Sequence, residues 1–277
     1  MSALHFFFVF FVVQKINNSS GIISPEMHQI GELNEQPLHA ALKAYYAGPD
    51  AETEVLVDGY HVDVVRDGVL IEIQTGNFSA IKRKLGHLVP HHPLRLVYPI
   101  AVEKWILKYS QEGGKGSQTS PDVRIRLRRS DSTSANRRKS PKRGRPVDLF
   151  AELVSFPQLA LSPNFTLELA LIQEEEVRRD TGKKRWRRRG WETVERRLIQ
   201  VLARRTFRGP DDFARLLPPD LPETFTTADI AAGLQAPLWL AQKTAYCLRE
   251  MGAIERVGVD GRSSLYARGE GVAGHLT

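Results

Sequence analysis

The stretch GYHVDVVRDGVLIEIQTGNF, residues 59–78, most constrains the fold, because it reads as two short strands joined by a tight turn. An Asp-Gly pair at 67–68 between two alternating hydrophobic runs is the strongest short signal for a β-hairpin. A two-residue loop also fixes the register of the two strands. In that register, Asp63 lies directly opposite Glu72.

The expected pairing of Asp63 with Glu72 is unfavourable unless something lies between the carboxylates. Directly opposed residues have Cβ atoms ~4.5–5.5 Å apart, and like charges at that spacing are destabilising. A proton that raises one pKa would relieve the repulsion, and so would a divalent cation. The alternative is that both residues lie on a solvated sheet face. His61 and Gln74, the next pair on the same face, could orient water or a phosphate.

The composition indicates a basic, reducing-compartment protein of about two domains. The chain has 277 residues and a formal net charge of +7, with a pI near 9.6. A positive balance of this kind favours a polyanionic partner. The single cysteine, Cys247, excludes an intrachain disulfide framework and fits a cytoplasmic location. Nothing in the sequence indicates a small-molecule cofactor.

Residues 1–26 form an apolar N-terminal extension. The run HFFFVFFVV at 5–13 is shorter than the ~20 residues of a spanning helix. It also lacks the basic region and cleavage site of a signal peptide. It can be a weak membrane or export segment, an extra strand or anchor, or an over-extended start. We favour the last interpretation, with a start at Met27 and no membrane association.

Residues 27–110 show the pattern of an α/β core. Helices are expected at 34–48, with Asn34 as N-cap, and at 78–89, because apolar residues recur there at helical spacing. Alternating patterns predict a three-stranded meander between these helices and two short strands after them. The expected strands are 52–57, 60–66, 69–75, 94–100 and 103–109.

This order, with Asp63 near the end of one strand and Glu72-Ile73-Gln74 in the next, resembles the restriction-endonuclease-like, or PD-(D/E)XK, nuclease superfamily. The resemblance covers about residues 30–110. It implies that Asp63 and Glu72 bind a metal ion, and that Glu35 on the first helix completes the site. Gln74 stands where most members have lysine, so an intact but inactive site remains open. The LHAALK…EIQT core also resembles a bacterial group that carries a C-terminal winged helix.

The implied chemistry is hydrolysis of a phosphodiester bond. Such a reaction needs a hard cation to neutralise the phosphate and acidify water, and Mg²⁺ is held by one or two carboxylates. Mg²⁺ or Mn²⁺ is therefore the expected cofactor. The carbonyl of Ile73 is a further candidate ligand. Lys82 and Lys84, on the helix that follows, are candidates to replace the missing lysine.

Residues 111–146 are expected to form a basic flexible insertion, because they contain too few apolar residues to bury a core. The insertion ends in Pro-Lys-Arg-Gly-Arg-Pro at 141–146. This motif resembles an AT-hook, in which Arg143 and Arg145 would lie in a narrow minor groove. The alternative is an ordinary basic linker.

The core is expected to continue through 147–180, with an apolar strand at 165–172 and then a basic helical connector at 181–219. Arginine interleaved with tryptophan suits phosphate contact and base stacking, and a solvated loop is the equal alternative. The candidate contacts in this connector are Lys184, Arg185, Arg187 and Arg188.

Residues 220–268 resemble a winged-helix domain, followed by a tail at 269–277. A helix at 226–234, a second at 237–251 and a hairpin about Asp260-Gly261 make this pattern. In such a domain the second helix enters a major groove and the wing contacts the backbone. Lys243, Arg249 and Arg262 are the candidate contacts. Winged helices also serve as protein-interaction modules.

The sequence thus predicts an α/β protein with a restriction-endonuclease-like core (helix, three-stranded meander, helix, strands) and a C-terminal winged-helix domain. The expected function is a metal-dependent DNA endonuclease. The alternative is a non-catalytic DNA-binding protein or regulator on a degenerate nuclease fold, which Gln74 favours. DNA is the expected partner, and a homodimer is possible.

Overall fold

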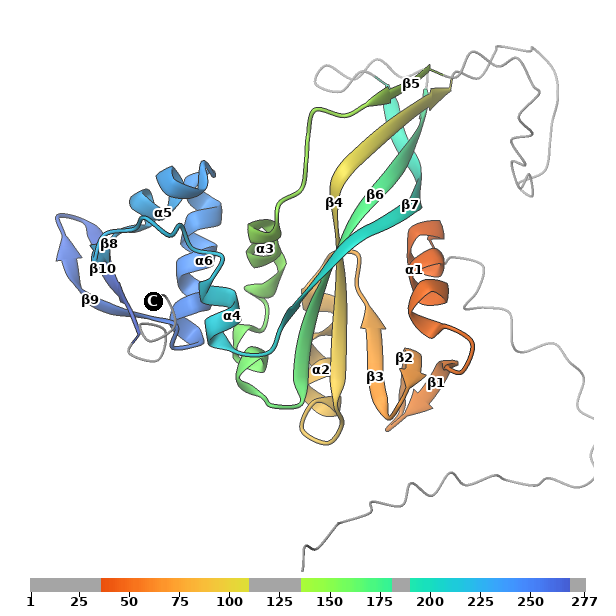
Figure 1. Cartoon of the computed structure of the whole chain (residues 1–277), viewed down its shortest axis with the longest axis horizontal. Helices are drawn as coiled ribbons and strands as arrows, with labels where there is room; N and C mark the ends of the chain where they lie inside the picture. Colours follow the sequence, from red (N-terminus) through yellow and green to blue (C-terminus); the bar gives the residue numbers. More distant parts are fainter. Residues whose placement is uncertain (1–35, 110–135, 181–189, 270–277) are drawn as a thin grey trace, which may run out of the picture. The chain divides into compact units, whose positions relative to one another are not determined.

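The computed structural model describes residues 36–109, 136–180 and 190–269, which belong to one compact unit (Figure 1). The architecture is mixed α/β, as expected: a seven-stranded sheet is followed by helices and a three-stranded sheet. Within these ranges no helix combines the length and apolar character needed to cross a membrane. The expected N-terminal extension lies outside the described residues.

The large sheet has an antiparallel meander at one edge and parallel strands at its centre. The order is β1-β2-β3-β4-β6-β7, with β5 beside the far end of β4. β3 pairs in parallel with β4, and β4 in parallel with β6, whereas the other pairs are antiparallel. The bounds are β1 (Glu52–Val57), β2 (Tyr60–Arg66), β3 (Val69–Ile73), β4 (Leu94–Tyr109), β5 (Asn136–Lys139), β6 (Phe165–Asp180) and β7 (Trp191–Phe207).

The β2–β3 hairpin turns where the sequence predicts. Asp67 and Gly68 both have positive φ, 52° and 73°, as a tight hairpin turn requires. The pairs Arg66–Val69 and Val64–Ile71 confirm the expected register next to the turn.

The two strands expected at 94–100 and 103–109 are wrong, since β4 is a single strand of 16 residues. Pro99 does not break it, although proline cannot donate to a sheet ladder. The reason is its position: β3 pairs with β4 only up to Val97, and β5 pairs only from Trp105. β4 instead continues on β6, with one register irregularity between Ala101 and Glu103.

Helices cover both faces of the large sheet in the part that contains β2 and β3 (Figure 1). The N-cap of α1 (Pro37–Ala47) is Gln36 rather than Asn34, and Leu38, Leu42 and Tyr46 of this helix pack on one face of the sheet. The opposite face carries α2 (Lys82–Leu88), preceded by the 3-10 turn η2 (Phe78–Ile81). The same face also carries three further short elements: η3 (Pro146–Leu149), α3 (Phe150–Leu153) and η4 (Pro157–Leu161).

The C-terminal elements share the hydrophobic core of the sheet's α2 face rather than forming a separate core. One buried cluster runs from Phe78 and Phe150 to Leu240 and Ile254. Thr226 caps the first of two helices through a capping box with Asp229, so this helix starts within one residue of the expected position. The bounds are α4 (Pro210–Ala214), β8 (Thr224–Phe225), α5 (Thr227–Leu234), α6 (Leu238–Glu250), β9 (Ile254–Asp260) and β10 (Ser263–Arg268).

Two expected segments have a different structure. The basic helical connector at 181–219 is wrong over 191–207, because these residues form β7 along the whole length of β6. The flexible insertion at 111–146 is wrong over 136–146, because β5 pairs with β4 and the next residues lead directly into η3. In both cases β-pairing with an earlier strand, β4 or β6, decides the structure of a strongly basic segment.

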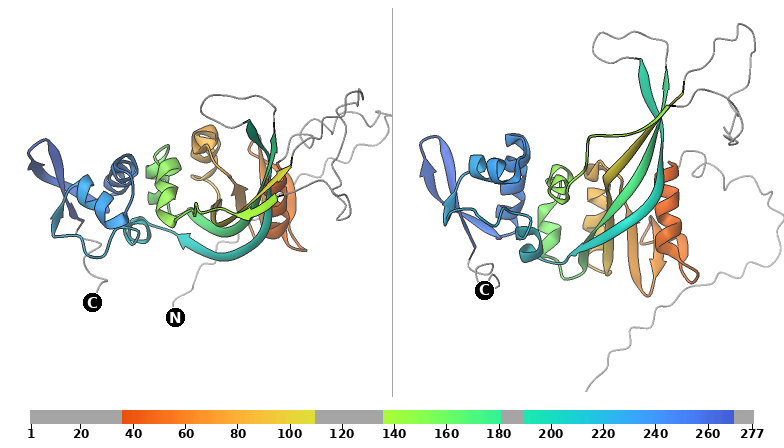
Figure 2. Two further views of the ribbon diagram at one scale, coloured as in Figure 1. Left: turned by 90° about the horizontal axis from the view of Figure 1, so that it is seen from above. Right: turned by 45° about the horizontal axis from the view of Figure 1, so that its top comes forward.

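Beyond the helices, three strands continue as what we call the sheet arm, formed by residues 103–109, 173–180 and 191–200 (Figure 2). Glu174 and Glu176 are buried in the arm although they are acidic. Lys104 lies 2.8 Å from Glu174 Oε1 and 3.2 Å from Glu176 Oε2, and Arg196 lies 2.6 Å from Glu174 Oε2. These cations compensate the buried acids.

Candidate active site

The candidate site lies where β2 and β3 separate. Their ladder ends at Val64–Ile71, so the expected ladder pairs of Asp63 with Glu72 and of His61 with Gln74 do not form. Asp63 instead turns its carboxylate to the end of β3, where Oδ2 accepts a 2.7 Å hydrogen bond from Ile73 N. Glu72 pairs along its other side with Leu96 of β4.

Asp63 is held from a second direction by His39 of α1. His39 Nε2 lies 3.3 Å from Asp63 Oδ2 and 3.1 Å from the carbonyl oxygen of Ile73. A carbonyl only accepts hydrogen bonds, so Nε2 carries the proton in this arrangement. His39 thus fixes both the carboxylate and the Ile73 carbonyl that the sequence offers as a metal ligand.

Glu72 is held by Lys84 of α2. Lys84 Nζ donates to Glu72 Oε2 at 2.5 Å and to the carbonyl oxygen of His61 at 2.5 Å. Lys84 therefore reaches from α2 across the point where β2 and β3 separate. Position 74, where the resemblance predicts a lysine, is a glutamine. Lys84 supplies an ammonium group to the carboxylate of Glu72 instead. Lys82, the other expected cation, is exposed on the first turn of α2.

The two carboxyls of the site have opposite pKa shifts. Burial and the nearby charge of Asp63 raise the pKa of Glu72 to about 7, although Lys84 opposes this. Burial also acts to raise the pKa of Asp63, but hydrogen bonds from His39 and Ile73 N outweigh it and leave that pKa lowered. Asp63 is therefore ionised at neutral pH, whereas Glu72 gains or loses its proton near neutral pH.

Gln74 does not point its amide at the carboxylates. Its side-chain nitrogen donates to the carbonyl oxygens of Gly76 and Asn77, the latter at 3.2 Å, and so fixes the turn into η2. Its backbone nitrogen donates to Val97 O at 2.9 Å. Gln74 therefore shapes the edge of the site rather than its centre.

The donor set fits a cation that keeps much of its water. The part of the chain that the structure describes contains no group of three or more His, Cys, Asp or Glu side chains arranged to hold a metal ion. Mg²⁺ needs only one or two carboxylates, with water and substrate oxygens completing its shell. Asp63 Oδ1 and Glu72 Oε1 take no part in the contacts given above. Glu35, the expected third acid, lies outside the described residues.

Residues 141–146, which resemble an AT-hook, pack against the core instead of forming a free basic segment. Arg145 Nη1 donates to the carbonyl oxygen of Leu234 at 2.6 Å, and its backbone nitrogen donates to Asp148 Oδ2 at 2.7 Å. Gly144 N donates to Ala101 O at 2.8 Å, which fixes the segment against β4. Arg145 thus ties the core to α5. Arg143 is exposed.

Of the C-terminal candidates for DNA contact, two bond to other residues of the protein and the third is exposed. Lys243 Nζ donates to the carbonyl oxygen of Ala151 at 2.8 Å, so this side of α6 packs on α3 and is not free to enter a groove. Arg249 forms a 2.8 Å ion pair with Glu250. Arg262 is exposed in the β9–β10 turn. The remaining basic candidates, Lys184, Arg185, Arg187 and Arg188, lie outside the described residues.

His39 is the site residue that the sequence reasoning missed. A signal for it exists: His39 lies on the same helical face as Leu42 and Tyr46, three and seven residues later, which are buried against the sheet. A histidine on an apolar helix face needs a polar partner inside the protein. The identity of that partner, Asp63, depends on the packing of α1 on β2.

Comparison with known proteins finds one family and one relative of this chain. The family described as "Domain of unknown function (DUF8091)" matches residues 36–124 and 121–208. A protein of Treponema pallidum (strain Nichols), described as "Uncharacterized protein", is 30% identical over 203 residues, which is 73% of this chain and 73% of that protein. No solved structure matches the chain significantly. The family match contains Asp63, Glu72 and Lys84 and ends before α5 and α6.

Proposed function

We propose that this chain, which belongs to the DUF8091 family, is a nuclease that hydrolyses phosphodiester bonds of DNA with bound Mg²⁺ or Mn²⁺. One observation carries the proposal: Asp63 and Glu72 meet at the point where β2 and β3 separate, with Lys84 on Glu72. Two carboxylates and one ammonium group suit binding of a cation beside a phosphate.

The proposal includes the fold of each part. The α1-β1-β2-β3-α2-β4 order, with parallel β3 and β4, supports a restriction-endonuclease-like core. The α5-α6-β9-β10 order, with β8 on the hairpin, supports a winged helix. The likeness to the PD-(D/E)XK superfamily rests on Asp63, Glu72 and the strands that carry them.

The chain's own residues would act as follows. The carboxylates of Asp63 and Glu72 and the carbonyl of Ile73 would hold the cation. A bound Mg²⁺ would neutralise the phosphate and lower the pKa of a water molecule. Lys84 would place a positive charge beside the phosphate oxygens, where it stabilises the transition state. His39 would keep Asp63 and Ile73 oriented.

A second candidate function is DNA binding without catalysis, on a degenerate nuclease fold. Gln74 favours it, because the amide that stands in the usual lysine position is used to hold the turn at Gly76 and Asn77. The closeness of Asp63 to Glu72 argues against it, because a binding platform has no need of two acids forced together.

The test is cleavage of labelled duplex, branched and single-stranded DNA, and of RNA, with EDTA, Mg²⁺ or Mn²⁺. The expected result is metal-dependent cleavage by the wild type that is lost in Asp63→Asn and retained in the control Lys82→Ala. Cleavage that survives Asp63→Asn contradicts this assignment. DNA binding without cleavage under all of these conditions selects the second candidate.

A further inference from the structure

Among the described residues, one edge of β4 has no strand partner between the stretches that pair with β3 and β5. β3 last pairs with it at Val97, and β5 first pairs with it at Trp105. A pocket of about 550 Å³ lies at this gap. This volume is within the usual range of sites for small molecules, and it exceeds the size of one nucleotide. The lining includes Thr75 and Tyr98, the cations Lys142, Arg143 and Arg196, and the acids Asp148 and Glu176.

One wall of the pocket is fixed by a glycine. Gly144 approaches β4 so closely that a Cβ there would lie 2.6 Å from Ile100 Cγ2 and 3.1 Å from Ala101 O. The backbone hydrogen bond from Gly144 to Ala101 holds the segment in place. Lys142 and Arg143 are therefore carried to the pocket by a segment with a defined position.

The cations of the pocket are of two kinds. Lys104 and Arg196 are compensated by the buried acids of the arm, as described above. Lys142 and Arg143 are exposed, and within the described ranges their side chains make no hydrogen bond or ion pair. The lining holds more cations than acids, and Lys142 and Arg143 are its exposed cations. This positive balance suits an anionic ligand.

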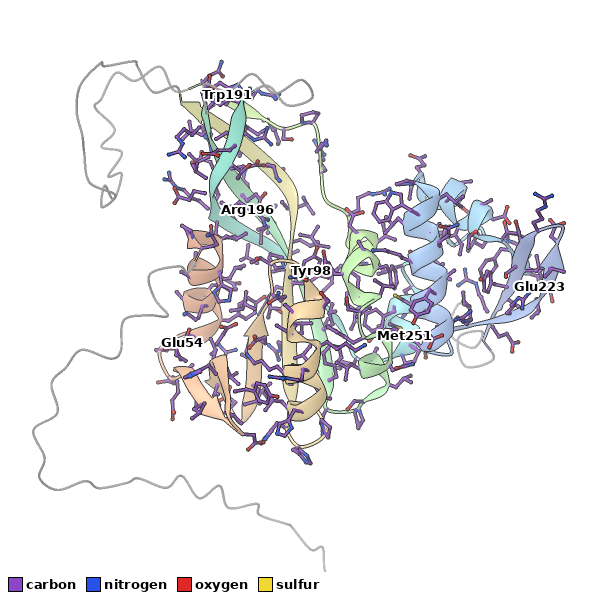
Figure 3. The ribbon with its side chains drawn as sticks, turned by 180° about the vertical axis from the view of Figure 1, so that it is seen from behind. Glu54, Tyr98, Trp191, Arg196, Glu223 and Met251 are labelled. Carbon is purple, nitrogen blue, oxygen red and sulfur yellow. The ribbon has the colours of Figure 1, made fainter. Side chains whose placement is uncertain are left out.

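Tyr98 adds a hydrogen-bond donor. Its ring packs edge-on against Phe78, with centroids 5.0 Å apart. Burial raises the pKa of its hydroxyl to about 12, so the hydroxyl keeps its proton. Within the described part of the chain the hydroxyl has no hydrogen-bond partner. Figure 3 labels Tyr98 at the base of the arm and Arg196 further along it.

The pocket begins next to the candidate active site. Gln74 N donates to Val97 O at 2.9 Å, so the residues that follow each of them, Thr75 and Tyr98, enter the pocket side by side. A strand that passes the carboxylates would reach the pocket within a short distance along its backbone.

We infer that this pocket receives an unpaired nucleotide of the substrate, with its phosphate on Lys142 and Arg143 and a polar group on the Tyr98 hydroxyl. The inference rests on the proposed nuclease function and names its substrate class: nucleic acid with a single-stranded segment beside the cleaved bond. A base within a duplex is stacked and paired, and it must leave the stack to enter a pocket of this kind.

The test measures binding of the full-length chain in EDTA, where the proposed cleavage cannot occur. The probes are a labelled DNA single strand, the blunt duplex of the same sequence, and that duplex with a single-stranded overhang, at one fixed salt concentration. We expect the single strand and the overhang to bind about tenfold more tightly than the blunt duplex, the size of one charge-assisted contact. Arg143→Ala and Lys142→Ala/Arg143→Ala should reduce this preference.

The matched control is Arg138→Ala, since Arg138 is an exposed arginine of the adjacent β5 that does not line the pocket. It should leave the preference unchanged, and Tyr98→Phe should reduce it without removing a charge. Equal binding of all three probes, or an equal effect of Arg143→Ala and Arg138→Ala, would overturn the inference.

The two proposals fail separately. Metal-dependent cleavage that is indifferent to the pocket variants would overturn the pocket and leave the nuclease standing. If the pocket variants reduce the preference for single-stranded DNA but no metal supports cleavage, the pocket is supported as a nucleotide site and the nuclease proposal is contradicted.

Discussion

Glu72 in the candidate active site and Glu176 in the sheet arm are equally buried, each with 6% of its surface exposed, yet their pKa values shift in opposite directions. For both, burial acts to raise the pKa. Around Glu176, hydrogen bonds from Arg178 and Thr193 and the charge of Lys104 overcome it and lower the pKa to about 2. Around Glu72, Lys84 opposes both burial and Asp63, and the pKa rises to about 7.

This difference separates a structural acid from a candidate functional one. Burial acts on both acids, and the direction of each shift follows from the surrounding charges and hydrogen bonds, including the charge of Asp63 beside Glu72. The arm surrounds Glu176 with enough positive charge and hydrogen bonds to keep this acid ionised. The candidate site leaves its pair of acids short of positive charge, which is the condition for binding a cation.

The largest expected effect is on cleavage. Glu72→Gln removes a proposed metal ligand without changing the size of the side chain, and it should lower metal-dependent cleavage about a hundredfold or more. Glu176→Gln, the matched change in the arm, should leave the rate of the remaining folded protein within a few-fold of wild type. Equal losses in the two variants would mean that the pKa contrast does not identify the site.

The order of the two variants should reverse for stability. Glu176→Gln removes an acid whose ionised form the folded arm stabilises, so it should lower the free energy of unfolding. Glu72→Gln removes a charge that the fold disfavours, so without metal it should be at least as stable as wild type near pH 8. Urea unfolding in EDTA measures both. A larger loss for Glu72→Gln would show that its ion pair with Lys84 dominates.

The pH dependence of stability should distinguish the same two acids. The folded-state pKa of Glu72, about 7, is above its ordinary value of 4.5. Its contribution to stability is therefore complete below pH 4.5 and is lost as the pH rises through 7. In EDTA the wild type should lose stability relative to Glu72→Gln across this window, by at most about 1.4 kcal/mol per pH unit. A difference that is flat across the window would contradict the raised pKa.

The smallest effect is expected at Gln74. Its side chain stabilises the turn at Gly76 and Asn77 rather than touching a carboxylate. Gln74→Ala should reduce cleavage by less than about tenfold, the range of one net hydrogen bond. A loss as large as that of Glu72→Gln would place Gln74 among the groups that contact the substrate.

Local chemistry made part of this structure predictable. The Asp-Gly turn fixed the β2–β3 register, and the capping box at Thr226 fixed the start of α5. Both features depend on residues close together in the sequence. The same hairpin placed Asp63 and Glu72 near each other, although its extrapolation beyond Val64 failed because Asp63 bonds to Ile73 N instead.

Long-range packing decided the features that could not be predicted. β7 is a strand because it pairs with β6. Its apolar residues do not alternate regularly with its arginines and glutamates, so the sequence pattern does not indicate a strand. The charges of Lys243 and Arg145 suggested DNA contacts. In the structure Lys243 donates to the carbonyl oxygen of Ala151, and Arg145 donates to that of Leu234. His39 joined the site only through the packing of α1 on the sheet.

The most direct test of the central claim, that Asp63 and Glu72 bind a divalent cation, is calorimetric titration of Mn²⁺ into the full-length chain near pH 8. We predict saturable binding to the wild type and Glu176→Gln, and its loss in Asp63→Asn and Glu72→Gln. At a hundredfold the dissociation constant, Mn²⁺ should add ~2.7 kcal/mol to the stability of only the two binding proteins. Absence of binding to the wild type, or equal binding to all four proteins, would contradict the account.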